Sequence, residues 1–297
     1  MKFQKLRTGT LWGWLVLALA SVLFAVMAVL VKVAIGSIPG PEAALLRFSS
    51  GLVACLGAHC RWTLRPKNKR ALFNRGLYGG VAVCLYYIAM VHLPVGLATL
   101  LMYTSPVFTA VYAVYFLKDR PTIRTYVALT LTALGVLLVI KATTPVGSLF
   151  GWWQLLAVLA AGFSGVSLAT ISELRRSKEG SWEIFTAFCL GGIAVSLLLW
   201  AGQLWSWVSP SPKQWLILML ASCISVVSQL MLSYGYGFFP DGKTAASGII
   251  FQITPVAALA MDWLIFGHEL VGLTLAGVGI TIFGIIAGIT TTNGTKQ

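Results

Sequence analysis

The chain has 297 residues, of which 58% are hydrophobic and only 10% are charged, and its formal net charge is +13. A soluble domain carries about 25% charged residues, so a single aqueous core cannot hide this much apolar surface, and the lipid bilayer is the expected solvent. The positive charge does not indicate a nucleic-acid partner. The basic residues lie in short segments between long apolar runs, where they orient helices against a membrane.

Ten segments have the roughly 20 mostly apolar residues that a membrane-spanning helix needs. In chain order they are 12–34, 42–61, 76–92, 95–117, 123–141, 151–171, 182–203, 213–238, 244–266 and 270–290. Turn-forming residues such as Pro39-Gly40-Pro41 and Pro240-Asp241-Gly242 separate them. The predicted fold class is therefore all-α integral membrane, with ten transmembrane helices.

The distribution of basic residues predicts the orientation of these helices, because Lys and Arg collect on the cytoplasmic side. With the N-terminus inside, that side receives every Lys and Arg except Lys32, Arg47, Lys141 and Lys213. The run from Arg61 to Arg75 is thereby assigned to a cytoplasmic loop. We expect a multi-pass protein of the cell membrane with both termini in the cytoplasm.

The ten segments divide into two halves of five, residues 1–145 and 146–297. An odd number of spans in each half forces the halves into opposite orientations, which is typical of inverted-repeat transporters. An ungapped alignment of 106–141 with 255–290 supports the repeat, because it matches Pro106 with Pro255, Thr132 with Thr281, and Gly135 with Gly284.

Two matched segments resemble a known family. Tyr103–Phe108, running to Phe116–Arg120, is similar to the P-V-F … L-G-E signature of the EamA type of the drug/metabolite transporter superfamily. The second copy, 253–256 running to 266–269, is similar as well, and Ala44–Phe48 resembles the family's arginine-bearing second helix. The first copy departs from the signature, with Lys118-Asp119 in place of Gly-Glu. The resemblance implies a ten-helix inverted-repeat carrier of amino acids, nucleosides, sugars, other metabolites or drugs.

Charged residues inside a span are costly, which makes them candidates for function. We assign Lys32, Arg47 and Asp262 to gating or charge coupling, and expect Glu42 to reach the membrane interface beside its turn. One hypothesis pairs Lys32 with Asp262 when the outer gate is closed. A second has Lys32, together with Arg47, binding a substrate carboxylate, and a third has Lys32 only reaching toward the interface.

Helical spacing places Lys32 and Asp262 on stripes that we expect to face other helices, because small residues permit close approach. The stripes are Ser21, Ala25, Ala28 and Lys32 in the first segment and Gln252, Pro255, Ala258 and Asp262 in the ninth.

Polar residues near mid-depth are the predicted substrate-binding set: Tyr86, Tyr87, Tyr103, Ser228, Gln229 and Gln252. Tyr103 and Gln252 occupy equivalent repeat positions, each three residues before a paired proline. Pro106 and Pro255 are predicted to break their helices, which a membrane protein tolerates where a cavity or neighbouring protein satisfies the freed backbone groups.

The leading function is a secondary transporter, rather than an enzyme, for a small polar solute such as an amino acid, working by alternating access and in the direction of export. The alternatives are an integral-membrane enzyme acting on a lipid-linked substrate, and a non-transporting scaffold or sensor. The few scattered acids argue against the first alternative. Histidine and cysteine spacing predicts no metal site, and no cofactor motif occurs in the sequence. Gly284-xxx-Gly288 predicts a helix-packing face or a homodimer contact.

Overall fold

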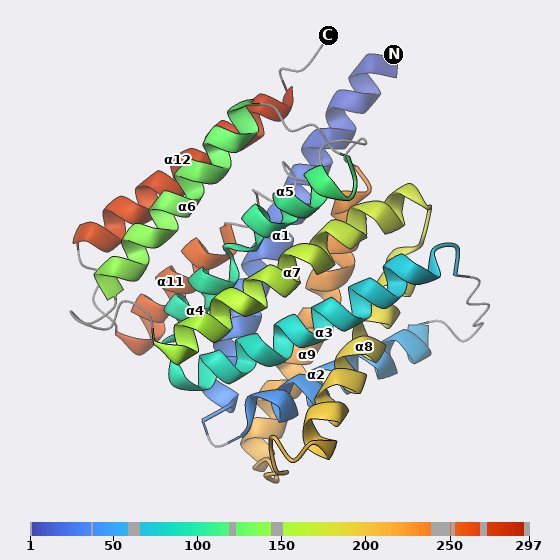
Figure 1. The fold of residues 1–297 in the computed structure, drawn as a ribbon, viewed down its shortest axis with the longest axis vertical. Coiled ribbons are helices and arrows are strands. Elements are labelled where there is room, and N and C mark those ends of the chain that lie inside the picture. Colours follow the sequence, from blue (N-terminus) through green and yellow to red (C-terminus); the bar gives the residue numbers. More distant parts are fainter. Residues whose placement is uncertain are drawn as a thin grey trace.

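The computed structural model describes residues 2–36, 38–58, 66–118, 123–143, 151–238, 250, 253–267 and 272–293. In this part of the chain the elements are α-helices, which lie against one another as shown in Figure 1. Their bounds are α1 Lys2–Ala34, α2 Gly40–Ala58, α3 Lys69–His92, α4 Val95–Met102, α5 Ser105–Tyr115, α6 Ile123–Thr143, α7 Trp152–Arg176, α8 Ser181–Ala201, α9 Pro212–Tyr236, α11 Ile253–Phe266 and α12 Gly272–Asn293.

Five helices are long and apolar enough to cross a membrane by length and composition, counting α4 and α5 as one span. They are Leu11–Ala34, Val95–Tyr115, Trp152–Arg176, Ser181–Ala201 and Pro212–Tyr236, and shorter apolar helices accompany them. Large hydrophobic side chains are exposed on many of these helices, among them Leu15, Leu198 and Leu216. An exposed apolar surface of this extent is what a bilayer covers, so the all-helical membrane fold is confirmed at this level.

Local capping explains where α3 and α9 begin. The side chain of Asn68 accepts a hydrogen bond of 3.0 Å from the backbone N–H of Ala71, which caps α3 at Lys69. The sequence prediction started this helix seven residues later, at Gly76, so it was wrong about the first two turns. Ser211 and Gln214 form a reciprocal capping box at the start of α9.

The fourth predicted span is two helices in the structure. The chain turns at Tyr103 and Thr104, after which α5 begins at Ser105 with Pro106 in its first turn. Proline fits the first turn of a helix because the backbone N–H it lacks would have no helical partner there. In the second half, α11 begins at Ile253, so Pro255 also lies in a first turn.

The helix contacts follow a reciprocal pattern between the two halves. The first helix of the first half, α1, packs along α9, the third helix of the second half, and α3 packs along α7 in the same way. The remaining equivalent helices meet each other directly, α2 against α8 and α6 against α12. Such exchange of equivalent contacts is the pattern that a two-fold relation between two similar halves produces.

Between α6 and α12, which lie side by side along one edge of the molecule (Figure 1), equivalent small residues make equivalent contacts. Gly135 of α6 lies directly against the side chain of Thr281, and Gly284 of α12 lies against Thr132, where a β-carbon on the glycine would come within 2.6 Å of the hydroxyl oxygen. These are the same four residues that the repeat alignment matched.

Candidate functional site

A cavity between the two halves is lined by side chains from helices on both sides. The first half supplies Arg47 of α2, Arg75 of α3 and Tyr103 at the α4–α5 break, while the second half supplies Phe188 of α8 and Gln229 of α9. Its further walls are Phe24, Met27, Ala28, Gly79, Ala82, Val83, Tyr86, Met102, Ser105, Ser164, Ser167, Leu168 and Leu232. Few, well-placed polar groups in a mostly apolar wall are typical of small-molecule sites.

The structure brings together four of the predicted site residues, Arg47, Tyr86, Tyr103 and Gln229, in this wall. The Tyr86 hydroxyl lies 2.7 Å from that of Thr99, and Gln229 accepts a hydrogen bond of 2.9 Å from Arg75. These hydrogen bonds hold Tyr86 and Gln229 in one orientation at the cavity surface, because turning away would leave a buried polar group without a partner.

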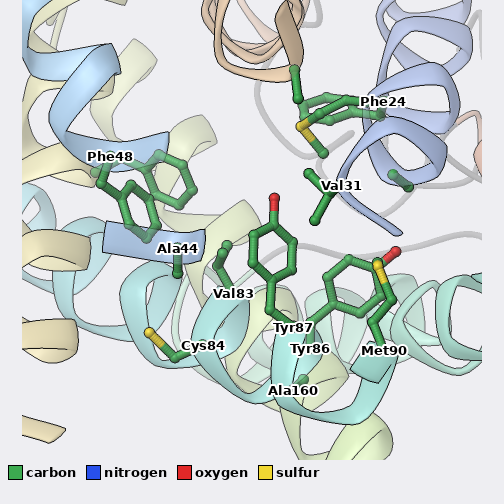
Figure 2. Packing of buried hydrophobic residues seen from close by; sticks show 14 of the residues in the cluster. Phe24, Val31, Ala44, Phe48, Val83, Cys84, Tyr86, Tyr87, Met90 and Ala160 are labelled. Atoms are coloured by element: carbon green, nitrogen blue, oxygen red, sulfur yellow. The ribbon is translucent and has the colours of Figure 1, made fainter. Parts of the chain in front are cut away.

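Two other predicted residues lie behind the wall. Tyr87 is fully buried, and its hydroxyl accepts a hydrogen bond of 3.2 Å from Arg47. Figure 2 shows its ring rising from α3 between Ala44 of α2 and Val31 of α1. Ser228 is buried and donates to the carbonyl of Ser225, one turn back along α9. Tyr87 therefore supports Arg47, whereas Ser228 bonds within its own helix.

Lys32 lies outside the cavity wall and is held by backbone. Its ammonium donates to the carbonyls of Met90, at 2.6 Å, and Leu93, at 2.8 Å. Carbonyls at the end of a helix have no helical partner and carry the negative end of its dipole, so a cation there is favourable. Ser21, Ala25 and Ala28 of the same stripe are all buried, as predicted for a stripe that faces other helices.

Asp262 is buried on α11 beside α4, where a β-carbon added to Gly96 would lie 3.2 Å from its carboxylate. It interacts electrostatically with Lys32. Glu42 corrects the expectation that it reaches the interface. It is fully buried, and its carboxylate accepts a hydrogen bond of 2.9 Å from the backbone N–H of Val208, which holds the segment between α8 and α9.

Arg75 is the residue that the sequence reasoning missed, because the predicted third span began one residue after it. In the structure it is 3% exposed and donates to Ser167 at 2.7 Å as well as to Gln229. A signal was present. Arg75, Gly79, Ala82 and Tyr86 have the same i, i+4, i+7, i+11 spacing that singled out Lys32, and all four line the cavity.

Gln252 lies outside the described residues, so its predicted place in the cavity stays a prediction. Within the described part of the chain, no group of three or more His, Cys, Asp or Glu side chains gathers in a way that could hold a metal ion. The residues that line the cavity offer hydrogen bonds, positive charge and aromatic surface, which suit the binding of a solute.

Comparisons with known proteins follow the same two halves. The sequence profile of the EamA-like transporter family matches residues 11–141 and again residues 151–290. The chain is 26% identical over 282 residues to the pseudopaline exporter CntI of Pseudomonas aeruginosa (strain UCBPP-PA14), an alignment that covers 93% of this chain and 95% of that protein. It is also 26% identical over 192 residues to the uncharacterized transporter YdfC of Bacillus subtilis (strain 168), covering 64% of this chain and 61% of that one. A solved crystal structure has the same fold, with a TM-score of 0.72 at 17% identity, covering 96% of this chain and 98% of the other.

Proposed function

Because the chain belongs to the EamA-like transporter family, we propose that it is a secondary transporter that exports a small polar metabolite, an amino acid or a related solute, by alternating access. The observation that carries the proposal is the cavity itself. Arginine, tyrosine, serine and glutamine side chains converge between the two halves of a protein whose outer surface is apolar. The direction of transport rests on the similarity to a protein named as an exporter.

The architecture we infer is ten transmembrane helices in two inverted repeats of five, residues 1–145 and 146–297, with both termini in the cytoplasm. The reciprocal packing of α1 on α9 and of α3 on α7 supports this inference. The start of α1 and the end of α12 lie at the same end of the molecule (Figure 1), as an even number of crossings requires.

For the outer gate we propose that the charges of Lys32 and Asp262 are coupled, and that their separation accompanies opening. Lys32 joins α1 to the end of α3 through its hydrogen bonds to Met90 and Leu93. Separation of Asp262 from Lys32 would therefore affect how both helices are held. Lys32→Met, Asp262→Asn and the double variant test this in a transport assay. Coupled groups give non-additive effects of about 0.5–3 kcal/mol, and additive losses in transport rate would contradict the gate.

Solute flux tests the proposed function directly. Proteoliposomes containing the purified protein and loaded with a bacterial metabolite extract should lose specific solutes faster than empty liposomes, as measured by mass spectrometry. Ser164→Trp places an indole in the cavity wall and should stop this loss, whereas Leu159→Trp, on the lipid-exposed side of the same helix, should not. Equal loss from liposomes with and without protein would contradict transport. A product formed from an added lipid-linked substrate would instead support the enzyme alternative.

A further inference from the structure

Two buried arginines meet at one aromatic ring inside the cavity. Arg47 of α2 is 5% exposed and Arg75 of α3 is 3% exposed. The guanidinium carbon of Arg75 lies 4.4 Å from the centroid of the Phe188 ring, and that of Arg47 lies 6.0 Å from the same centroid. Both distances are in the range of a cation–π contact, so Phe188 of α8 holds two cations from the opposite half of the protein at one place.

The hydrogen-bond partners of both guanidiniums are neutral. Arg47 donates to the hydroxyls of Ser225, at 2.8 Å, and Tyr87, while Arg75 donates to Ser167 and to the amide oxygen of Gln229. Each guanidinium has five N–H donors, so both retain capacity for further acceptors. The Nε of Arg75 is buried without a hydrogen-bond partner.

No carboxylate balances these charges among the described residues. Of the buried acids, Glu42 accepts a hydrogen bond from the backbone N–H of Val208, and Asp262 interacts electrostatically with Lys32. The charged group near Arg75 is Arg47, which has the same charge. A buried charge is costly unless it is paired, and two like charges near one another raise that cost further.

A permanent function in folding would be served better by an internal acid, because a buried charge with a paired counter-charge costs less than a buried charge without one. Positive charge without an internal counter-charge is what a site needs if its counter-charge arrives and leaves with the ligand. The rest of the lining limits the ligand further. Phe24, Met27, Val83, Leu168 and Leu232 are apolar and suit a hydrocarbon segment between charged ends.

We propose that the transported solute carries two carboxylates, one bound by Arg47 and the other by Arg75, with the carbon chain between them lying against Phe188. This deepens the proposed function and rests on it, because the cavity is taken to be the transport site. Arginine suits the role since its planar guanidinium binds a carboxylate through two parallel hydrogen bonds. Tyr87, Ser167, Ser225 and Gln229 are positioning residues that orient the two guanidiniums.

Matched ligands of different charge test the proposal on the native protein. The probes are succinate, glutarate and adipate, each with its half-amide and its diamide, which keep the length while lowering the charge from two to one to none. The thermal stability of the purified protein in detergent is measured at constant ionic strength, because a ligand that binds the folded state raises the melting temperature by mass action. We expect at least one dicarboxylate to bind about tenfold or more tightly than its half-amide, since a charge-assisted hydrogen bond contributes about that factor.

Three variants connect this effect to the two arginines. Arg47→Gln and Arg75→Gln should each remove the preference for two charges over one. Arg70→Gln, which removes an exposed arginine from the same helix as Arg75, should leave that preference unchanged. If a glutamine variant fails to fold, Arg47→Lys and Arg75→Lys replace it. They keep the charge but lose the two-bond geometry, so binding of the dicarboxylate should weaken while its advantage over the diamide persists.

Four results would overturn the proposal: stabilisation by the diamides equal to that by the dicarboxylates, a charge effect that survives both glutamine variants, loss of the preference in Arg70→Gln, or stronger binding of glycerol 3-phosphate than of any dicarboxylate. The flux assay separates this proposal from the proposed function. Export of neutral solutes that dicarboxylates do not inhibit would leave transport standing and refute the dicarboxylate site. Tight dicarboxylate binding without flux would do the reverse.

Discussion

Two residues with a left-handed backbone end the equivalent helices α5 and α11. Lys118 has φ 55° and Gly267 has φ 69°, and they occupy the same position in the two copies of the family signature. Glycine adopts this conformation without strain, whereas a residue with a β-carbon is strained by about 1–2 kcal/mol. The first copy therefore has lysine where the signature has glycine, but its backbone keeps the left-handed conformation that glycine adopts easily.

Lys118→Gly should stabilise the protein by about 0.5–1 kcal/mol, because relief of strain exceeds the greater entropy of glycine in the unfolded chain. The melting temperature of the purified protein measures the effect. Lys118→Ala is the matched control: it removes the same charged side chain but retains the β-carbon, and should give no gain. An unchanged or lower melting temperature for the glycine variant would show that φ at this position carries no strain.

At the scale of elements, glycines set the distance between α3 and α8. Gly76 and Gly80 of α3 face Gly191 and Gly192 of α8, and a β-carbon added to Gly80 would lie 2.8 Å from the α-carbon of Gly192. A β-carbon on Gly191 would overlap the backbone of Gly76. Since α3 carries Arg75 and α8 carries Phe188, this close crossing also brings the arginine onto the ring.

Gly191→Ala should therefore push α3 and α8 apart, costing about 1–3 kcal/mol of stability and weakening ligand binding at Arg75. Gly279→Ala is the control, because a β-carbon there meets no atom within 4 Å, and alanine in a helix is favoured by up to about 1 kcal/mol. Melting temperature and ligand binding are measured for both. A stable Gly191→Ala variant that binds normally would contradict the role given to this crossing.

At the scale of the whole molecule, two contacts within the described part of the chain join connections that the charge distribution assigns to the same side of the membrane. In one, the backbone N–H of Asn68 donates to Glu179, which joins the start of α3 to the α7–α8 connection, both predicted to be cytoplasmic. In the other, Gln214 donates to the carbonyl of Ala34, joining the start of α9 to the end of α1. The side of the membrane that each pair of connections faces stays a prediction.

Cysteine labelling in intact cells tests that prediction, with Cys60 and Cys223 first replaced by serine. Lys69→Cys should resist an impermeant maleimide until the cells are permeabilised, and Ser209→Cys should react at once. Both positions are exposed and neither caps a helix, unlike Asn68, whose side chain holds the first turn of α3. Labelling of Lys69→Cys in intact cells would reverse the orientation.

The sequence by itself determined the class of protein, the repeat of its two halves and part of the cavity wall. Long apolar segments require lipid, and matched prolines, threonines and glycines reveal the repeat, because these are local properties that a single chain displays directly. Buried small-residue stripes follow from helical spacing alone, as Ser21, Ala25 and Ala28 show. Arg47, chosen as a charge inside a span, and Tyr86, Tyr103 and Gln229, chosen as polar residues near mid-depth, line the cavity.

Only the tertiary structure decided which charges meet. Arg75 looked like a loop residue because the apolar run begins after it, whereas in the structure the helix continues past its apolar segment to its cap, Asn68. Likewise, Lys32 bonds to the carbonyls of Met90 and Leu93 at the end of α3, and Glu42 bonds to the segment before α9. Both are contacts between positions far apart in the chain. Spacing along one helix shows which face a residue occupies, but the partner on that face is set by how distant helices pack, which no local pattern contains.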